Sequence, residues 1–203
     1  RHLPAQLHLA WSRLAALAGQ GCPPLSPEDG PVLVTGGGLS EGPARLLVAL
    51  LREAGVRCAY APLSQFVAPR SSSVSSSTPE STGAAGTLVL FSQGLAPNAR
   101  FPLLQLSRFR RTLLVTSVDP FAADSSQNSD TASLGRLAAR LLHGGVQIVT
   151  LPPAREDGLL LRVIGPAVHA LAAAYLAGID LATLAGVPAL YEPPPTPGVI
   201  PPQ

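Results

Sequence analysis

The sequence predicts one α/β domain, a three-layer sandwich in which helices cover both faces of a five-stranded parallel sheet. Five short apolar runs alternate with segments of helical periodicity, and strands that read as continuous apolar runs are typical of such sheets. Two of these runs end in loops of glycine and serine that lead directly into a helix start. The chain has 203 residues, of which 46% are apolar and only 4% aromatic, so we expect one core of aliphatic side chains.

The helices are indicated by apolar residues at steps of three and four, as in Leu7, Trp11, Leu14 and Leu17. Gly165-Pro166 interrupts the last helical stretch, so Pro166 is a second candidate start for that helix. The expected elements in chain order are helix 3–19, strand 32–35, helix 41–55, strand 56–61, strand 87–91, helix 98–108, strand 112–117, helix 129–143, strand 146–150 and a helix within the outer limits 159–177.

Two segments are expected to lie outside the packed elements of a domain that spans residues 1–186. The insertion 68–86 consists mainly of serine, threonine, glycine and alanine, which bury too little apolar surface to order a segment. We expect a mobile loop there, with a lid or a phosphorylatable segment as the alternative. The tail over 187–203 is rich in proline and is expected to be extended or disordered.

Charge and hydropathy exclude several classes of partner. A net charge of +2 with 13% charged residues is too weak and dispersed to favour nucleic-acid binding. No stretch reaches the roughly 18–20 apolar residues of a membrane helix, and no signal-peptide pattern is present. We therefore expect a cytoplasmic protein without a membrane partner. All 14 basic residues are arginines, so no lysine of this chain can form a Schiff base.

The cysteines and other metal-ligating residues indicate neither a metal nor a cofactor. Cys22 and Cys58 are far apart in the sequence, and two free thiols are the favoured interpretation, with a disulfide left open. No two histidine, cysteine, aspartate or glutamate residues are spaced as ligands on one element. We expect no metal and no cofactor.

The chemistry is predicted at the two corners where a strand passes through a loop into a helix. The loops are Gly36–Ser40, after strand 32–35, and Ser92–Asn98, after strand 87–91. Helix N-termini present free backbone N–H groups, and glycine lets an anion approach the main chain. With the strand order 2-1-3-4-5, both loops meet over one crevice where the order reverses. The expected phosphate-binding residues are Gly37, Gly38, Ser40, Ser92, Gln93, Gly94 and Asn98.

At these residues the chain resembles the sugar isomerase (SIS) domain family. That family has a glycine-rich loop ending in serine after one strand, matched here by 35–40, and a strand that ends in Ser-Gln-Ser-Gly-Glu-Thr. The second corner here reads Phe91-Ser92-Gln93-Gly94-Leu95, which keeps the Ser-Gln start and lacks the second serine and the acidic–threonine pair. The resemblance covers most of residues 3–180. It implies a single SIS domain with the flavodoxin-like order 2-1-3-4-5 and a sugar phosphate as ligand.

The resemblance also implies a catalytic base. In the isomerase half of glucosamine-6-phosphate synthases, a Pro-Glu-x-Gly segment after the fifth strand carries the glutamate that moves the proton. Glu156 stands at the equivalent place here, and Gly158 matches the glycine. An isomerase of the phosphoglucose/phosphomannose type pairs glutamate with histidine, and His169 is the candidate for that role. A single carboxylate that reaches both carbons can interconvert an aldose and a ketose.

Structural alternatives remain open for each of these residues. Ser40 fits the N-cap of the following helix, Ser92 fits an ordinary loop hydroxyl, and Glu156 fits a solvated turn. His169 lies on an apolar helix, where a core or interface histidine is the other interpretation. The glycines of 36–42 also fit a dinucleotide-binding loop, although no acidic residue ends the second strand.

The sequence therefore favours a phosphosugar-binding protein that isomerises a sugar phosphate with a glutamate base. The alternative is a non-catalytic module that senses a sugar phosphate and regulates a partner. Because SIS enzymes are commonly dimers or tandem copies, the resemblance implies a homodimer or half of a protein with two such domains. The apolar helices over 3–17 and 159–177 are the expected interface surfaces.

Overall fold

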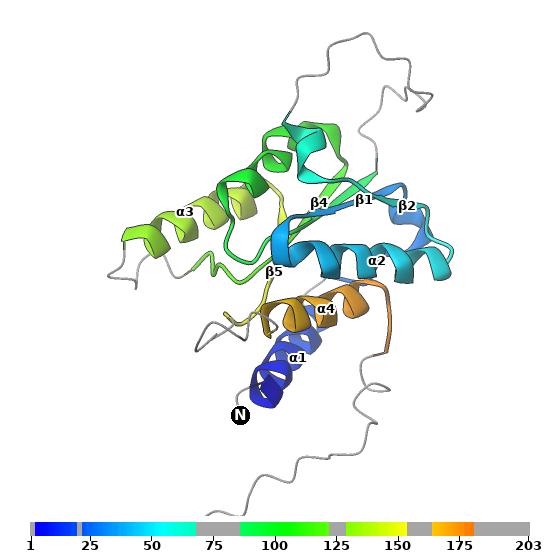
Figure 1. The fold of residues 1–203 in the computed structure, drawn as a ribbon, viewed down its shortest axis with the longest axis horizontal. Helices are drawn as coiled ribbons and strands as arrows, with labels where there is room; N and C mark the ends of the chain where they lie inside the picture. The colour runs from blue at the N-terminus through cyan, green and yellow to red at the C-terminus, as the bar shows by residue number, and fades with distance from the viewer. Residues whose placement is uncertain (1–2, 20–21, 68–85, 122–128, 154–163, 181–203) are drawn as a thin grey trace, which may run out of the picture.

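A five-stranded, all-parallel sheet with the order β2-β1-β3-β4-β5 forms the centre of the molecule (Figure 1). The computed structural model describes residues 3–19, 22–67, 86–121, 129–153 and 164–180. The observed order confirms the predicted one, including the reversal between the first and third strands. The strands are β1 (Val32–Gly36), β2 (Cys58–Tyr60), β3 (Thr87–Phe91), β4 (Arg111–Thr116) and β5 (Gln147–Thr150).

Helices cover both faces of the sheet (Figure 1). Along β3, Val89 and Phe91 pack into the cluster of α1, α2 and α4, whereas Leu90 packs on the other face, against α3 and η5. Alternation along a strand sends successive side chains to opposite faces, so an apolar run of five residues can serve both cores. The helices are α1 (Leu3–Gly19), α2 (Glu41–Glu53), α3 (Ser129–His143) and α4 (Ile164–Leu176), and the short 3₁₀ turns include η2 (Gly38–Ser40), η3 (Leu63–Phe66), η4 (Pro97–Arg100) and η5 (Pro102–Arg108).

The predicted helix 98–108 is wrong, because the chain forms the two 3₁₀ turns η4 and η5 there. Pro102 lacks an N–H group and cannot continue a helix from η4, and Gln105 leaves the helical region with φ −118°. The second strand is also shorter than the predicted 56–61. The Val56 N–H donates to Leu51 O at 2.8 Å, so this residue closes the end of α2 and does not extend β2.

The last helix begins at Ile164, inside the predicted limits and ahead of Pro166. The missing N–H of Pro166 costs nothing in the first turn, where N–H groups have no partner within the helix. Most of the predicted insertion, the tail over 187–203 and Glu156 lie outside the described residues. Among the described helices, none has the length and hydropathy needed to cross a membrane. Cys22 and Cys58 are free thiols, as favoured by their spacing.

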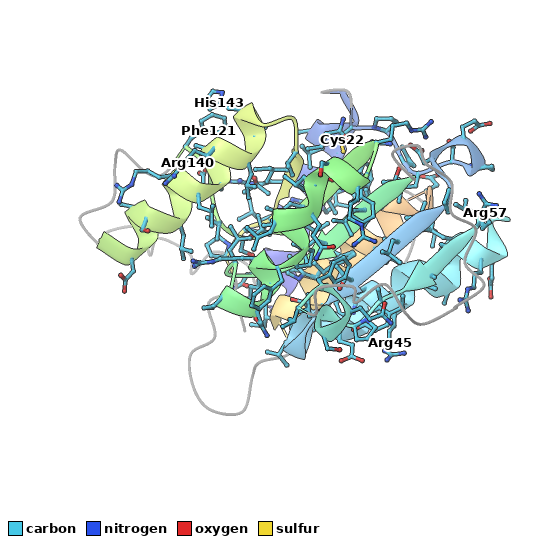
Figure 2. All side chains as sticks on the ribbon, turned by 90° about the horizontal axis from the view of Figure 1, so that it is seen from above. Cys22, Arg45, Arg57, Phe121, Arg140 and His143 are labelled. Atoms are coloured by element: carbon cyan, nitrogen blue, oxygen red, sulfur yellow. The ribbon has the colours of Figure 1, made fainter. Side chains whose placement is uncertain are left out.

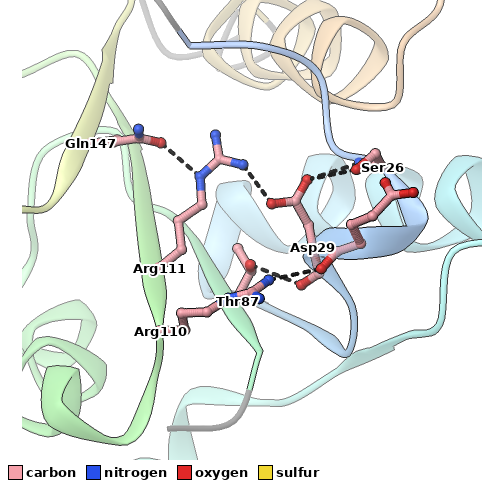
Figure 3. A network of polar contacts seen from close by, with 7 residues as sticks. Ser26, Asp29, Thr87, Arg110, Arg111 and Gln147 are labelled. Atoms are coloured by element: carbon pink, nitrogen blue, oxygen red, sulfur yellow. Dashed lines mark hydrogen bonds and ion pairs between the residues drawn. The ribbon is translucent and has the colours of Figure 1, made fainter.

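A polar network joins the amino-terminal edge of the sheet to the connector before β1 (Figure 3). The Asp29 carboxylate accepts hydrogen bonds from Arg111 Nη1 at 2.7 Å and from the Ser26 amide at 3.0 Å. The Thr87 hydroxyl donates to Asp29 O at 2.9 Å, and Arg111 Nε donates to Gln147 Oε1 at 2.8 Å. The network therefore ties β3, β4 and β5 to residues that precede the first strand.

Candidate functional site

The two predicted corners lie next to one another at the carboxyl edge of the sheet. Gly36 and Phe91, the last residues of β1 and β3, are paired in the parallel ladder, so both loops start from neighbouring positions. A methyl group on Gly37 would lie 4.0 Å from Asn98 Nδ2 and 2.6 Å from Leu63 Cδ1. The first loop therefore meets η4, which belongs to the second loop, and η3, which follows β2.

The first loop is a tight turn that ends in a buried hydroxyl. A methyl group on Gly36 would lie 2.7 Å from Ser40 O, so the turn requires glycine at this position. Tyr60 Oη donates to Gly36 O at 2.8 Å and ties the turn to β2. Gly38 is exposed and has φ +58°.

Ser40 is only 5% exposed, at the start of α2. Its backbone is helical, with φ −84° and ψ −7°, and its side chain makes no capping hydrogen bond with the described residues. An N-cap residue has extended backbone angles and accepts a hydrogen bond from the first turn. The capping alternative is therefore not observed for Ser40.

The second loop is anchored to β4 through its backbone. The Ser92 N–H donates to Val115 O at 2.9 Å. Gln93 O accepts from the Ser117 N–H at 2.9 Å and from Thr116 Oγ1 at 3.1 Å. Ser92 is only 5% exposed.

Among the described residues, the buried hydroxyl at this edge that lacks a hydrogen-bond partner is that of Thr35, next to Gly36 in β1. Such a hydroxyl is unfavourable by itself and occurs where a ligand completes a site.

Leu95 holds the second loop in a turn that few non-glycine residues adopt. Its φ is +50°, and its side chain is fully buried in the cluster that contains Leu103. Arg100 Nε donates to Leu95 O at 3.1 Å. Burial of the leucine side chain and this hydrogen bond offset the cost of the backbone conformation. Gly94 and Asn98 remain exposed on either side of Leu95.

The Gln93 side chain leaves the loop toward α4. Gln93 follows Val89 and Phe91 in the alternation, so it continues the face of β3 that α4 covers. Its carboxamide lies directly against the first turn of α4, where a methyl group on Gly165 would be 2.8 Å from Oε1 and 2.9 Å from Nε2.

His169 lies in the core below the second loop. It is 1% exposed, and its ring centroid is 6.1 Å from that of Phe91. Burial lowers the pKa of His169 from 6.5 to about 4, so the ring is neutral at physiological pH. Nε2 has no partner among the described residues. His169 therefore lies in the core beside the end of β3, and it is not among the exposed side chains of the two loops.

The charged groups near the first loop are paired with one another. Arg45 Nε lies 2.7 Å from Glu41 Oε1, and its guanidinium lies 4.4 Å from the centre of the Tyr60 ring. Figure 2 shows Arg45 at the opposite end of the molecule from Arg140 and His143 of α3. The donors that the two loops themselves offer are hydroxyls, the carboxamides of Gln93 and Asn98, and backbone amides. Within the described ranges, no three metal-ligating side chains lie together.

Three residues that support the corners were not singled out from the sequence. Thr116 and Tyr60 each donate to a loop carbonyl, and Gly165 makes room for Gln93. The position of Thr116 at the end of a predicted strand was the available signal for that residue. In the sequence, Gly165 shows only the pattern of a helix interruption. Its contact with Gln93 spans 72 residues and leaves no local pattern.

Comparisons with known proteins show similarity to solved structures only. No family model matches the chain, and no curated protein matches it. Among solved structures, the chain is similar to one described as E. coli CFT073 c3406 in complex with A5P, with 20% identity and a TM-score of 0.42. The match covers 91% of this chain and 94% of that one. A similarity of this size says nothing about what the present chain binds.

Proposed function

We propose that the chain is a SIS-type protein that binds a phosphorylated sugar at the carboxyl edge between β1 and β3. The observation that carries this proposal is the meeting of the two loops, with Gly37 beside Asn98. Ser40 and Ser92 are nearly buried at this edge, and the buried Thr35 hydroxyl has no partner among the described residues. Ser40 and Ser92 belong to the two sequence patterns that resemble a phosphosugar site.

The donors suit a phosphate group held without lysine. The 13-residue α2 directs its first N–H groups toward the first loop, and an oxyanion at such a position is favoured by about 0.3–1 kcal/mol at an exposed site. Hydroxyls at Ser40 and Ser92 add hydrogen bonds to the charged oxygens, worth about 1.5–3 kcal/mol each. A sugar attached to the phosphate would then extend over the exposed Gly94 and Asn98.

Binding without turnover is the function that the described residues favour. His169 is buried and neutral, and a ring closed off from solvent is poorly placed to exchange protons with a sugar above the strand ends. We keep isomerisation of the sugar phosphate as the second candidate, because Glu156 follows the end of β5 by six residues in the sequence. In that case Glu156 is the base that moves the proton.

A thermal-shift titration tests the binding function. The probes are fructose 6-phosphate, glucose 6-phosphate, mannose 6-phosphate and inorganic phosphate. A ligand at about 100 times its dissociation constant adds roughly 2.7 kcal/mol of stability, so one sugar phosphate should raise the melting temperature well beyond phosphate alone. Ser92→Ala should weaken this shift, whereas the control Ser107→Ala, at an exposed position on η5, should leave it unchanged. Equal shifts with all four probes, or none, contradict the proposal.

Deuterium exchange at the carbon next to the carbonyl group separates the two candidates; this carbon is C2 in glucose or mannose 6-phosphate and C1 in fructose 6-phosphate. A binding module leaves the C–H bond at this carbon intact, and an isomerase exchanges its hydrogen with solvent. If exchange occurs, Glu156→Gln should abolish it while the thermal shift persists. Exchange that survives Glu156→Gln would exclude this glutamate as the base.

A further inference from the structure

We propose that Gly165, in the first turn of α4, is a positioning residue that sets the Gln93 carboxamide at the carboxyl edge for ligand binding. This inference rests on the proposed function, because Gln93 is expected to contact the phosphorylated ligand. It assigns a role to a residue that contacts no ligand itself and lies 72 positions away in the sequence.

The contact follows from the way α4 packs on β3. Phe91 and Gln93 are two residues apart and continue one face of the strand, while Gly165 and His169 are four residues apart and share one face of the helix. The His169 ring lies beside Phe91, with 6.1 Å between centroids, and Gly165 lies beside Gln93. Two successive turns of α4 therefore contact two successive positions of β3 and its loop.

The backbone of Gln93 is fixed independently of α4. Its carbonyl accepts hydrogen bonds from the Ser117 N–H at 2.9 Å and from Thr116 Oγ1 at 3.1 Å, both from the end of β4. A change at Gly165 therefore acts on the flexible Gln93 side chain before it acts on the loop backbone.

The missing Cβ of Gly165 is what permits this contact. A methyl group there would lie 2.8–3.0 Å from Oε1, Nε2 and Cδ of Gln93, closer than carbon contacts allow, and these three atoms are the nearest ones to it. Because they form the end of a rotatable side chain, Gly165→Ala should turn the carboxamide away without unfolding the protein. Alanine is also a better helix former than glycine, so the helix itself gains from the change.

The side-chain amide resonances of Gln93 test the contact without any ligand. They are assigned as the pair that disappears from the ¹H–¹⁵N spectrum of Gln93→Ala. Gly165→Ala should move this pair. Gly42→Ala should not, since Gly42 lies in the first turn of α2 and a methyl group there meets nothing within 4 Å. An unmoved pair in Gly165→Ala overturns the proposal.

Affinity for the sugar phosphate that stabilises the wild-type protein tests the positioning role. Loss of one hydrogen bond to a charged group weakens binding about tenfold or more, so Gln93→Ala and Gly165→Ala should each lose roughly tenfold. The double variant should lose no more than Gln93→Ala alone, because Gly165 acts through Gln93. Ser107→Ala, at an exposed position on η5, should bind as the wild-type protein does.

The outcomes separate this inference from the proposed function. Wild-type affinity in Gly165→Ala, or losses that add in the double variant, overturns the positioning role while phosphosugar binding stands. If the wild-type protein binds none of the sugar phosphates, the proposed function fails, and the Gln93 amide resonances alone decide whether Gly165 places this side chain.

Discussion

At the scale of single residues, the sequence identified the polar groups of the edge better than the groups that support them. Ser40, Ser92 and Gln93 were chosen from local patterns, and the fold puts their two loops together. Gly165 and Tyr60 act through contacts between distant segments. Contacts between distant segments leave no pattern in a short window of sequence. Residues that support a site through such contacts can therefore be found only once the strand order and register are known.

The buried histidine makes folding stability depend on pH. Its pKa of about 4 in the folded protein lies below its ordinary value of 6.5, so the unfolded chain binds more protons between these values. The free energy of unfolding is therefore unaffected by His169 above pH 6.5 and decreases as the pH falls toward 4. The difference between the two pKa values corresponds to a loss of roughly 3 kcal/mol.

His169→Leu, which keeps the volume apolar, should therefore lose less stability between pH 7.5 and pH 4.5 than the wild-type protein. Urea denaturation at both pH values measures the difference, and carboxylates that titrate in both proteins cancel in the comparison. Parallel losses in the two proteins would show that His169 is protonated in the folded state or is not buried.

The Gly36 turn should tolerate no side chain. Gly36→Ala places a methyl group 2.7 Å from Ser40 O, a backbone atom that cannot rotate away. We expect a loss of about 1–3 kcal/mol in the free energy of unfolding, measured by urea denaturation. Gly42→Ala, with open space around the added methyl group, is the control and should cost nothing. Equal stability of the two variants would mean that the first loop has room for a methyl group beside Ser40 O.

At the scale of elements, the strands and their order were predictable because continuous apolar runs between amphipathic helices leave few possible arrangements. The short 3₁₀ turns η4 and η5 could not be predicted in the same way. Residues 98–108 have helical periodicity, but Pro102 breaks the hydrogen-bond ladder and yields η4 and η5. The start of β2 differs from the predicted one because the Val56 N–H donates to Leu51 O at the end of α2. Hydropathy does not show whether this N–H bonds to the helix or to a neighbouring strand.

The Asp29–Arg111 pair should stabilise the amino-terminal edge of the sheet. Partial burial by itself raises the pKa of the Asp29 carboxyl, but the hydrogen bonds from Ser26 and Arg111, with the charge of Arg111, lower it overall. Asp29→Ala leaves the half-buried Arg111 without its carboxylate, so we expect a loss of about 1–3 kcal/mol at pH 7.

The pH dependence of this loss gives a second check. Because the folded pKa of Asp29 is lowered, its contribution is present above the unfolded value of about 4 and disappears as the pH falls below it. Wild-type and Asp29→Ala proteins should therefore converge in stability at low pH in urea denaturation. A constant difference across pH would assign the effect of the substitution to the backbone near Asp29 and not to its charge.

At the scale of the whole molecule, one edge of the sheet stabilises the fold and the other carries the proposed binding site. The amino-terminal edge carries the Asp29 network, and the carboxyl edge carries the two loops (Figures 1 and 3). Asp29→Ala should accordingly lower the melting temperature without changing the affinity for a sugar phosphate.

If the chain forms the homodimer that the resemblance implies, α1 is the predicted interface helix that still has an exposed apolar side chain. The apolar face of α4 packs against α1 and α2 of its own chain, whereas α1 exposes Leu9 by 49%. Leu9→Glu should shift a dimer toward monomer in analytical ultracentrifugation. Leu142→Glu, at an exposed leucine of α3 on the other face of the sheet, is the control and should leave the dimer intact. A dimer that persists in Leu9→Glu would place the interface elsewhere.

The most direct test of a phosphosugar site between β1 and β3 is a ¹H–¹⁵N map of backbone amide shifts during titration with the sugar phosphate that stabilises the protein. We predict that the shifts concentrate in the loops 36–40 and 92–98, and that Gly37, Gly38, Ser92 and Gly94 move most. Inorganic phosphate should move a subset of the same amides. Shifts that cluster at the Asp29 network, or spectra that do not change, would contradict a phosphosugar site between β1 and β3.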